Sequence, residues 1–176
     1  MEIGQGYPRV LRQLQQDYEC WMIAPFEQTS LPPGAQHLLQ ERLITGKFET
    51  GNTAIPVDTF DCVFSVAVLG QLPNNPDVFE NALCTINQAL APGGYSLHCV
   101  NVILKPDRIS LNGALSYFGT HADPLHEFVS FDTLRNDPDL FTLSEQFYKA
   151  HWQAKTKQPY KRFGKPTVCN VLWQKA

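Results

Sequence analysis

The sequence lacks the apolar run of about 18–20 residues that a membrane-spanning helix requires. It also has no N-terminal segment in which positive charges precede an apolar stretch, the pattern of a secretory signal. None of its five cysteines belongs to a Cys-x-x-Cys pair, which argues against a zinc site and a disulfide framework. We therefore expect a cytoplasmic protein with no membrane segment and no metal, whose thiols are reduced and mostly buried.

An excess of positive charge is also missing. Fourteen Lys and Arg against seventeen Asp and Glu give a net charge of −3, which argues against a general nucleic-acid-binding protein. The chain has 176 residues, 43% of them hydrophobic, which is enough for one core. Residues 1–176 are therefore interpreted as a single domain.

The clearest pattern lies in residues 58–102. Residues 60–66 are β-branched and aromatic without strict alternation, which is typical of a strand covered on both faces. Asn75 followed by Pro76 predicts a helix start, and Pro92-Gly93-Gly94 predicts its end, with a glycine in the left-handed conformation. A second strand is predicted over residues 95–102, parallel to the first. The helix between them has one apolar stripe, made of Phe79, Leu83, Ile86 and Leu90.

Glycines near the N-terminus predict a loop suited to ligand binding. Gly4 and Gly6 lie between a short strand and an amphipathic helix that starts near Pro8. Such a loop lets a ligand approach the backbone closely and points helix N–H groups at it. The alternative is a plain strand-to-helix turn with glycine caps.

Together these segments resemble the class I S-adenosylmethionine-dependent methyltransferases. The resemblance implies an α/β fold, Rossmann-like, with a mostly parallel twisted sheet, flanking helices and an antiparallel C-terminal strand. It also implies S-adenosyl-L-methionine as the cofactor. The alternative is a generic α/β unit with a glycine turn. The residues that carry the resemblance are Glu2-x-Gly4-x-Gly6, Ile55-Pro56, Phe60-Asp61-Cys62-Val63-Phe64-Ser65 and Leu90-x-Pro92-Gly93-Gly94.

The resemblance assigns the glycine loop to the cofactor. Glu2, Gly4 and Gly6 would line its methionine and ribose portion. The family usually ends the second strand with an acid that binds the ribose hydroxyls, but here that position is Ala24. We expect Ala24 to face the glycine loop in a site open to water. Glu27 is the candidate replacement, with a solvated loop charge as the alternative.

Two further strand ends are assigned in the same way. Lys47 stands where the family often has an acid that contacts the adenine amine, so Glu49 is the candidate for that contact. Phe48 is either a ring that stacks on adenine or an ordinary core residue. Ser65 and Val66 match the family segment beneath the cofactor. All these positions fall at the carboxyl ends of predicted strands, where ligands bind in open α/β sheets.

Residues 105–131 would cover the acceptor pocket in the resembling fold. The segment is rich in rings, and one short helix is expected over residues 108–118. Tyr117, His121 and His126 are the candidate acceptor contacts, although each histidine is also consistent with an ordinary surface residue. His98, inside a predicted strand, is interpreted as a hydrogen-bonded core histidine.

The C-terminal part is predicted to contain two more strands, over residues 141–150 and 166–174, and a helix is predicted earlier over residues 35–42. The connector between the two C-terminal strands is basic. Either it binds a phosphorylated or nucleic-acid acceptor, or it is a solvated loop whose lysines protect an edge strand, the reading that we favour. Its cationic residues are Lys155, Lys157, Lys161, Arg162 and Lys165.

The function predicted from these features is methyl transfer to a small-molecule acceptor. The alternative is a catalytically silent methyltransferase-like interaction module, which Ala24 and Lys47 favour. A nicotinamide-dependent reductase is a weaker reading, since the third glycine of that fingerprint is absent. Only Met1 precedes Glu2, whereas the family has a longer strand and a helix first. We expect the chain to begin upstream, to be a fragment, or to have the gap covered by another chain in a homo-oligomer.

Overall fold

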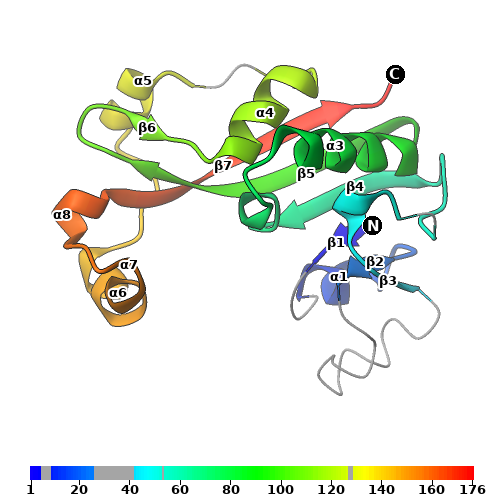
Figure 1. The fold of residues 1–176 in the computed structure, drawn as a ribbon, viewed down its shortest axis with the longest axis horizontal. Coiled ribbons are helices and arrows are strands. Elements are labelled where there is room, and N and C mark those ends of the chain that lie inside the picture. Colours follow the sequence, from blue (N-terminus) through cyan, green and yellow to red (C-terminus); the bar gives the residue numbers. More distant parts are fainter. Residues whose placement is uncertain (5–8, 26–41, 53, 127–128) are drawn as a thin grey trace.

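A seven-stranded, mostly parallel sheet forms the centre of the computed structural model, which describes residues 1–4, 9–25, 42–52, 54–126 and 129–176 (Figure 1). The strand order is β3-β2-β1-β4-β5-β6, and β7 pairs with β5 as well. The first five strands run parallel, whereas β6 and β7 are antiparallel to β5. The strands are β1 (Glu2–Ile3), β2 (Met22–Ala24), β3 (Leu43–Thr45), β4 (Phe60–Val66), β5 (Leu90–Leu104), β6 (Ile109–Ser110) and β7 (Lys165–Gln174).

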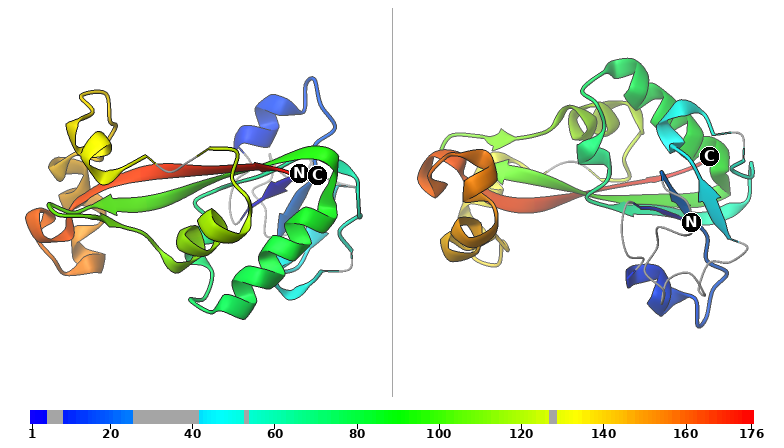
Figure 2. Two further views of the ribbon diagram at one scale, coloured as in Figure 1. Left: turned by 90° about the horizontal axis from the view of Figure 1, so that it is seen from above. Right: turned by 60° about the horizontal axis from the view of Figure 1, so that its bottom comes forward.

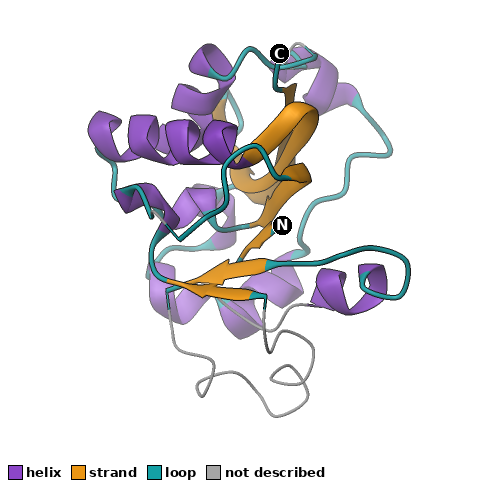
Figure 3. Ribbon diagram, turned by 90° about the vertical axis from the view of Figure 1, so that its right-hand side faces the viewer, coloured by secondary structure: helices purple, strands orange, loops and turns teal. Residues whose placement is uncertain are grey.

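Helices lie on both sides of this sheet. Figure 2 shows α3 and α4 on one side of β5 and β7 and α1 on the other, and Figure 3 shows the same layering from the side. The α/β, Rossmann-like fold class is therefore confirmed. The helical segments are α1 (Arg9–Leu14), η2 (Phe48–Thr50), η3 (Leu69–Gln71), α3 (Pro76–Ala89), α4 (Gly113–His121), α5 (Phe131–Asn136), α6 (Glu145–His151), α7 (Gln153–Thr156) and α8 (Tyr160–Phe163).

The β4–α3–β5 unit agrees with the sequence pattern. The side chain of Asn75 accepts a hydrogen bond from the Asp77 backbone N–H at 3.0 Å, which caps the first turn of α3. Gly93 adopts the expected left-handed conformation, with a φ of 76°, but α3 already ends at Ala89 with Leu90 as an extended C-cap, so the glycine turn does not end the helix as predicted. The ladder to β4 begins at Leu90, so β5 starts directly after α3 and includes the glycine turn.

The two faces of β4, β5 and β7 differ in burial. Ser96, His98 and Val100 are fully buried on the side of α3 and α4. On the opposite face, Tyr95 and Leu97 are 46% and 42% exposed. The expectation that β4 is covered on both faces is wrong for the described residues, because Val66 on that second face is 53% exposed. One apolar sheet face is therefore open in the part of the chain that the structure describes.

The predicted strand over residues 141–150 is wrong. The hydroxyl of Ser144 accepts a hydrogen bond from the Phe147 backbone N–H at 3.2 Å, so this residue caps α6 and the segment becomes helical. The chain before it still meets β7, because Thr167 donates its hydroxyl to the Phe141 carbonyl at 2.7 Å. The local capping signal outweighed the apolar pattern.

The helix near residues 108–118 and the burial of the cysteines also differ from the prediction. The helix predicted over residues 108–118 begins only at Gly113, where Asn112 caps it, and β6 precedes it. Of the cysteines, only Cys20 is buried, whereas Cys62 and Cys84 are exposed.

Within the described ranges, no helix combines the length and apolarity that crossing a bilayer would demand. The helix predicted over residues 35–42 lies almost entirely outside the described residues.

Candidate functional site: a cleft at the carboxyl ends of the parallel strands

A cleft of about 290 Å³ lies where β1, β2 and β3 end and where the chain leaves β4. This is the edge of a parallel sheet at which open α/β folds bind ligands. Its walls combine apolar side chains with the polar groups of Lys47, Glu49 and Gln71. The lining residues are Ile3, Gly4, Ile23, Pro25, Gly46, Lys47, Phe48, Glu49, Val68, Gln71 and Pro73.

Two glycines give this cleft its shape. A Cβ atom at Gly4 would lie 2.6 Å from the Cε of Met22 and 3.4 Å from Oε1 of Glu2, so the backbone there passes very close to its neighbours. Gly46 has a φ of 134°, and a Cβ atom would lie 2.6 Å from Nδ2 of Asn52. A larger residue at either position would displace a side chain that now packs against the backbone. Gly6 lies outside the described residues.

The Glu2 carboxyl adjoins Gly4 of the cleft, although Glu2 itself is not a lining residue and pairs with Met22, which packs on the α1 side of the sheet. Glu2 is 8% exposed, and its Oε2 is buried without a hydrogen-bond partner among the described residues. Burial raises the pKa of this carboxyl from 4.5 to about 7, against the smaller opposing effects of the Leu11 backbone and the N-terminal amine. A buried carboxyl oxygen without a donor is costly, and a ligand or water that donates to it would recover that cost.

The end of β2 differs from the sequence-based expectation. Ala24 is 1% exposed and packs with Leu11, Cys20 and Met22 on the α1 side of the sheet. It therefore does not lie in an open site, and that expectation is wrong. Side chains alternate along a strand, so the next residue, Pro25, is the one that lines the cleft. Glu27, the proposed replacement acid, lies outside the described residues.

The end of β4 also lines the cleft differently from expected. Ser65 is 1% exposed, and its hydroxyl lies 2.7 Å from Nδ1 of His98, while Val66 belongs to the open sheet face. Neither side chain lines the cleft. Ala67 has a φ of 57° and turns the chain, which brings Val68 to the cleft wall instead.

Val68, Gln71 and Pro73 also line the cleft, although the sequence pattern did not predict them. The available signal was the proline-containing turn that follows β4, at the point where the strand order reverses. Gln71 is fixed by its side chain, which donates to the Ala67 carbonyl at 2.8 Å.

The end of β3 agrees better with the expectation. Phe48 and Glu49 both line the cleft, from the first residues of η2. Phe48 is 5% exposed and belongs to the main core, which agrees with its interpretation as a core residue, whereas its stacking on adenine stays a prediction. Lys47 adds a positive charge to the same wall.

The candidate acceptor residues lie away from this cleft. The rings of Tyr117 and His121 are stacked with centroids 4.0 Å apart, and Tyr117 also packs on Phe79 of α3. His126 Nε2 lies 3.4 Å from the carbonyl oxygen of Asn170 on β7. None of the three lines the cleft. The described residues also contain no cluster of three or more His, Cys, Asp and Glu side chains that could hold a metal ion.

Sequence comparisons give no assignment, since no protein-family model and no curated protein matches this chain. Many solved structures share its fold. A SAM-dependent methyltransferase from Archaeoglobus fulgidus is 15% identical, with a TM-score of 0.53, over 99% of this chain and 84% of that one. The [4+2]-cyclase SpnF is 12% identical, with a TM-score of 0.58, over 99% and 73%.

A third structure was solved with its ligands in place. The geranyl diphosphate C-methyltransferase from Streptomyces coelicolor A3(2), in complex with Mg²⁺, geranyl diphosphate and S-adenosyl-L-homocysteine, is 10% identical, with a TM-score of 0.56. The match covers 99% of this chain and 70% of that one. At such low identities these similarities establish the architecture alone. The chain has the fold of the class I S-adenosylmethionine-dependent methyltransferases.

Proposed function

We propose that this protein binds S-adenosyl-L-methionine in the strand-end cleft and transfers its methyl group to a small-molecule acceptor. The observation that carries the proposal is the buried Glu2 carboxyl beside Gly4. Its oxygen without a donor suits a cationic, hydrogen-donating ligand, and Gly4, which lines the cleft, is the residue next to it along which such a ligand would approach. The same fold in solved methyltransferases supports the proposal.

The remaining cleft residues fit part of such a donor. Phe48 offers a ring face to an adenine, and Glu49 offers an acceptor to its amine. Pro25 offers no acceptor to ribose hydroxyls. Among the described residues the ribose end is therefore the weakest part of the fit, and we expect modest affinity for the donor.

The chain's own residues would act mainly by positioning. When bound, the donor supplies an electrophilic methyl group, which a nucleophilic acceptor takes by direct displacement. Holding the two reactants at near-attack distance lowers the barrier without a dedicated acid or base. Glu2 would fix the donor's cationic end, and the apolar walls at Ile3, Ile23 and Val68 would exclude water.

The contacts to the acceptor remain predictions. Gly70, next to Gln71 in the cleft wall, lies against Asn112, because a Cβ atom there would be 2.9 Å from Nδ2 of Asn112. The start of α4 therefore packs against the segment that carries Gln71, whereas Tyr117 and His121 lie further along that helix. Replacing Tyr117, His121 or His126 by alanine should leave donor affinity unchanged, since none of them lines the donor cleft.

Thermal unfolding with added ligand tests the donor proposal. S-Adenosylhomocysteine should raise the melting temperature and NADH should not, and a hundredfold excess over the dissociation constant adds about 2.7 kcal/mol. That corresponds to several degrees, at roughly 2–4 °C per kcal/mol for a domain of this size. The second candidate is a silent interaction module, which Pro25 and Lys47 favour. No shift at millimolar S-adenosylhomocysteine would select it.

We also propose that the open sheet face pairs with a second copy of the chain. Along β4, β5 and β7 the face carries apolar and uncharged polar side chains, from Phe64 and Val66 to Asn101 and Val168. Two such faces can meet without bringing like charges together. Exposed apolar faces of this kind are usually covered by association.

A further inference from the structure

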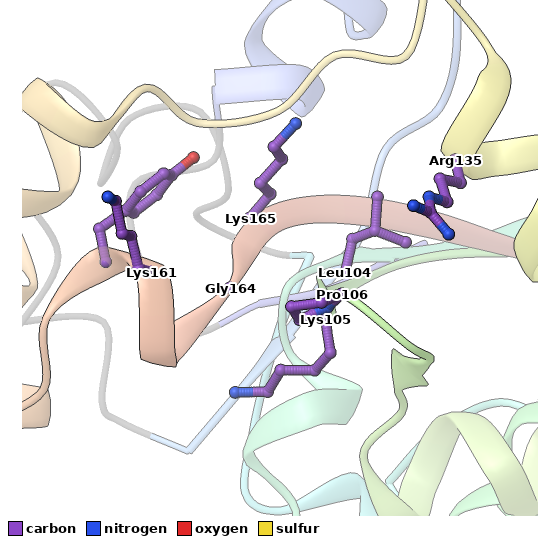
Figure 4. A pocket seen from close by; sticks show the side chains of 8 residues that line it. Leu104, Lys105, Pro106, Arg135, Lys161, Gly164 and Lys165 are labelled. Atoms are coloured by element: carbon purple, nitrogen blue, oxygen red, sulfur yellow. The ribbon is translucent and has the colours of Figure 1, made fainter.

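A second cleft, of about 390 Å³, lies at the far end of β5 (Figure 4). It has no lining residue in common with the candidate donor cleft. Its floor and walls include the apolar side chains of Leu104 and Pro106. Four of its eight lining residues are cationic, and none is acidic. The lining residues are Leu104, Lys105, Pro106, Arg135, Tyr160, Lys161, Gly164 and Lys165.

The cationic residues come from separate parts of the chain. Arg135 belongs to α5, Lys161 to α8 and Lys165 to the first position of β7. Figure 4 shows Arg135 on one side of Leu104, with Lys161 and Lys165 on the other. The sequence displays a basic run over residues 155–165, but only the fold adds Arg135 and the end of β5 to it.

Gly164 lies where the chain between α8 and β7 meets β5. It has a φ of 105°, and a Cβ atom would lie 2.7 Å from Cγ2 of Ile103 and 2.8 Å from the carbonyl oxygen of Leu104. The backbone between α8 and β7 is therefore packed directly against β5. This contact places Lys161 and Lys165 beside Leu104, and a residue larger than glycine would push them away.

Two polar side chains of the cleft are already engaged. The ammonium of Lys105 donates to the carbonyl of Arg162 at 3.0 Å and to that of Phe163, and it lies 5.6 Å from the Phe163 ring centroid. Tyr160 donates its hydroxyl to the Leu143 carbonyl at 2.7 Å. These bonds hold both ends of α8 in place, so both residues build the wall of the cleft.

Three cations are left for a ligand. Among the described residues, the side chains of Arg135, Lys161 and Lys165 have no hydrogen-bond or ion-pair partner. Burial and, to a smaller extent, the carboxylate of Glu145 raise the pKa of the neighbouring Tyr160. That carboxylate is paired with Lys149 at 2.9 Å. Like charges gathered in a concave site create a positive potential that attracts anions.

We propose that this cleft binds a small phosphate-bearing molecule. An arginine fork and two lysine ammoniums suit the several oxygens of a phosphate or diphosphate. The volume falls within the range of small-molecule sites, and Leu104 and Pro106 would contact an apolar part of the ligand. A nucleic-acid strand would need a longer groove with exposed rings for stacking, and the one ring that lines this cleft, Tyr160, is tied to Leu143. This binding site goes beyond the proposed methyl transfer, because it needs none of the donor-cleft residues.

Calorimetric titration of the full chain with inorganic pyrophosphate at low salt tests the proposal. The unmodified protein should bind pyrophosphate, and added salt should weaken the binding. The double variant Lys161→Gln, Lys165→Gln should raise the dissociation constant by about tenfold or more, as for the loss of charged hydrogen bonds. Arg135→Gln alone should weaken it as well. The matched control Lys155→Gln, Lys157→Gln removes the same charge from the same basic run and should leave the constant unchanged.

An absence of binding at millimolar pyrophosphate, or an equal loss in the control variant, overturns the proposal. A short single-stranded RNA that binds more tightly than pyrophosphate, and is weakened equally by both double variants, also overturns it in favour of a nucleic-acid surface. Circular dichroism checks that each variant is folded. Affinity for S-adenosylhomocysteine should be unchanged in the cleft variants, so this test is separate from that of the donor cleft.

Discussion

Ser65 Oγ and His98 Nδ1 lie 2.7 Å apart across β4 and β5, and Ser96 Oγ lies 2.7 Å from Nε2 of the same imidazole. The ring is fully buried, and its centroid is 5.0 Å from that of Trp173. Burial lowers the pKa of His98 from 6.5 to about 3. The imidazole is therefore neutral, so one serine accepts its N–H and the other donates to its free nitrogen. This confirms the interpretation of His98 as a core residue.

A neutral buried histidine makes stability depend on pH. The pKa of His98 is lower in the folded state, so its contribution is fully present above pH 6.5 and is lost as the pH falls toward 3. His98→Gln should lose some stability at pH 7, through poorer packing on Trp173, and should remove this part of the acid sensitivity. Urea unfolding at several pH values measures both effects. If the variant kept the full acid sensitivity of the unmodified protein, His98 would not be its source.

Neighbouring positions at the end of β2 give a matched pair of substitutions. Pro25→Asp puts a carboxylate on the cleft-lining side, where charged hydrogen bonds to ribose are worth roughly 1.5–3 kcal/mol each. It should tighten S-adenosylhomocysteine binding by about tenfold to hundredfold. Ala24→Asp buries a carboxylate against Leu11 and Met22, so it should destabilise the fold without improving binding. Calorimetry and thermal unfolding of both variants separate these effects. Tighter binding by Ala24→Asp would refute the side-chain directions described for β2.

Because the pKa of Glu2 is raised, replacing its carboxyl should change stability and ligand affinity in opposite directions. The folded-state pKa lies above the ordinary value, so the stability associated with the neutral form is full below pH 4.5 and is lost as the pH rises through about 7. The rise from 4.5 to about 7 corresponds to about 3 kcal/mol, so Glu2→Gln should be more stable than the unmodified protein at pH 8 by up to that amount.

The same variant should bind S-adenosylhomocysteine more weakly, since it lacks the carboxylate for the ligand's cationic amine. Denaturant unfolding at pH 4 and pH 8 measures the change in stability, and calorimetry at pH 8 measures the change in affinity for S-adenosylhomocysteine. Glu80→Gln, at an exposed position of α3, is the control and should change neither. A Glu2→Gln variant with unchanged affinity would remove Glu2 from the binding site.

The open sheet face predicts self-association. Light scattering should report a dimer or a larger species, and Leu97→Lys should shift it toward the monomer by placing a charge in the middle of the face. Leu111→Lys is the control, since Leu111 is similarly exposed, at 44% against 42% for Leu97, but lies between β6 and α4. A monomer at high concentration in the unmodified protein would exclude this pairing.

The sequence predicted best where local and global signals agree. Residues 60–66 form β4 as expected, and Asn75 caps α3, because apolar content, capping and turn chemistry all favour the same unit. The strand predicted over residues 141–150 is wrong because the Ser144 cap is a single local signal in a segment of mixed apolar and polar residues. The directions of Ala24 and Pro25 depend on strand register, which one residue of slip reverses. The basic cleft could not be predicted, since Arg135 and Lys165, which are far apart in the sequence, line one cleft only in the folded chain.

The length of β5 has a consequence for local opening. Its ladder with β4 ends at the Val66–Cys99 pair, whereas its ladder with β7 continues to Leu104, about 16 Å further along the strand. Among the described residues, Val100–Val102 have a partner strand on one side only. Two-stranded ribbons are marginally stable. We therefore expect amide hydrogens to exchange faster along this outer half than at Ser96 to Cys99, and an anion bound near Leu104 to slow that exchange.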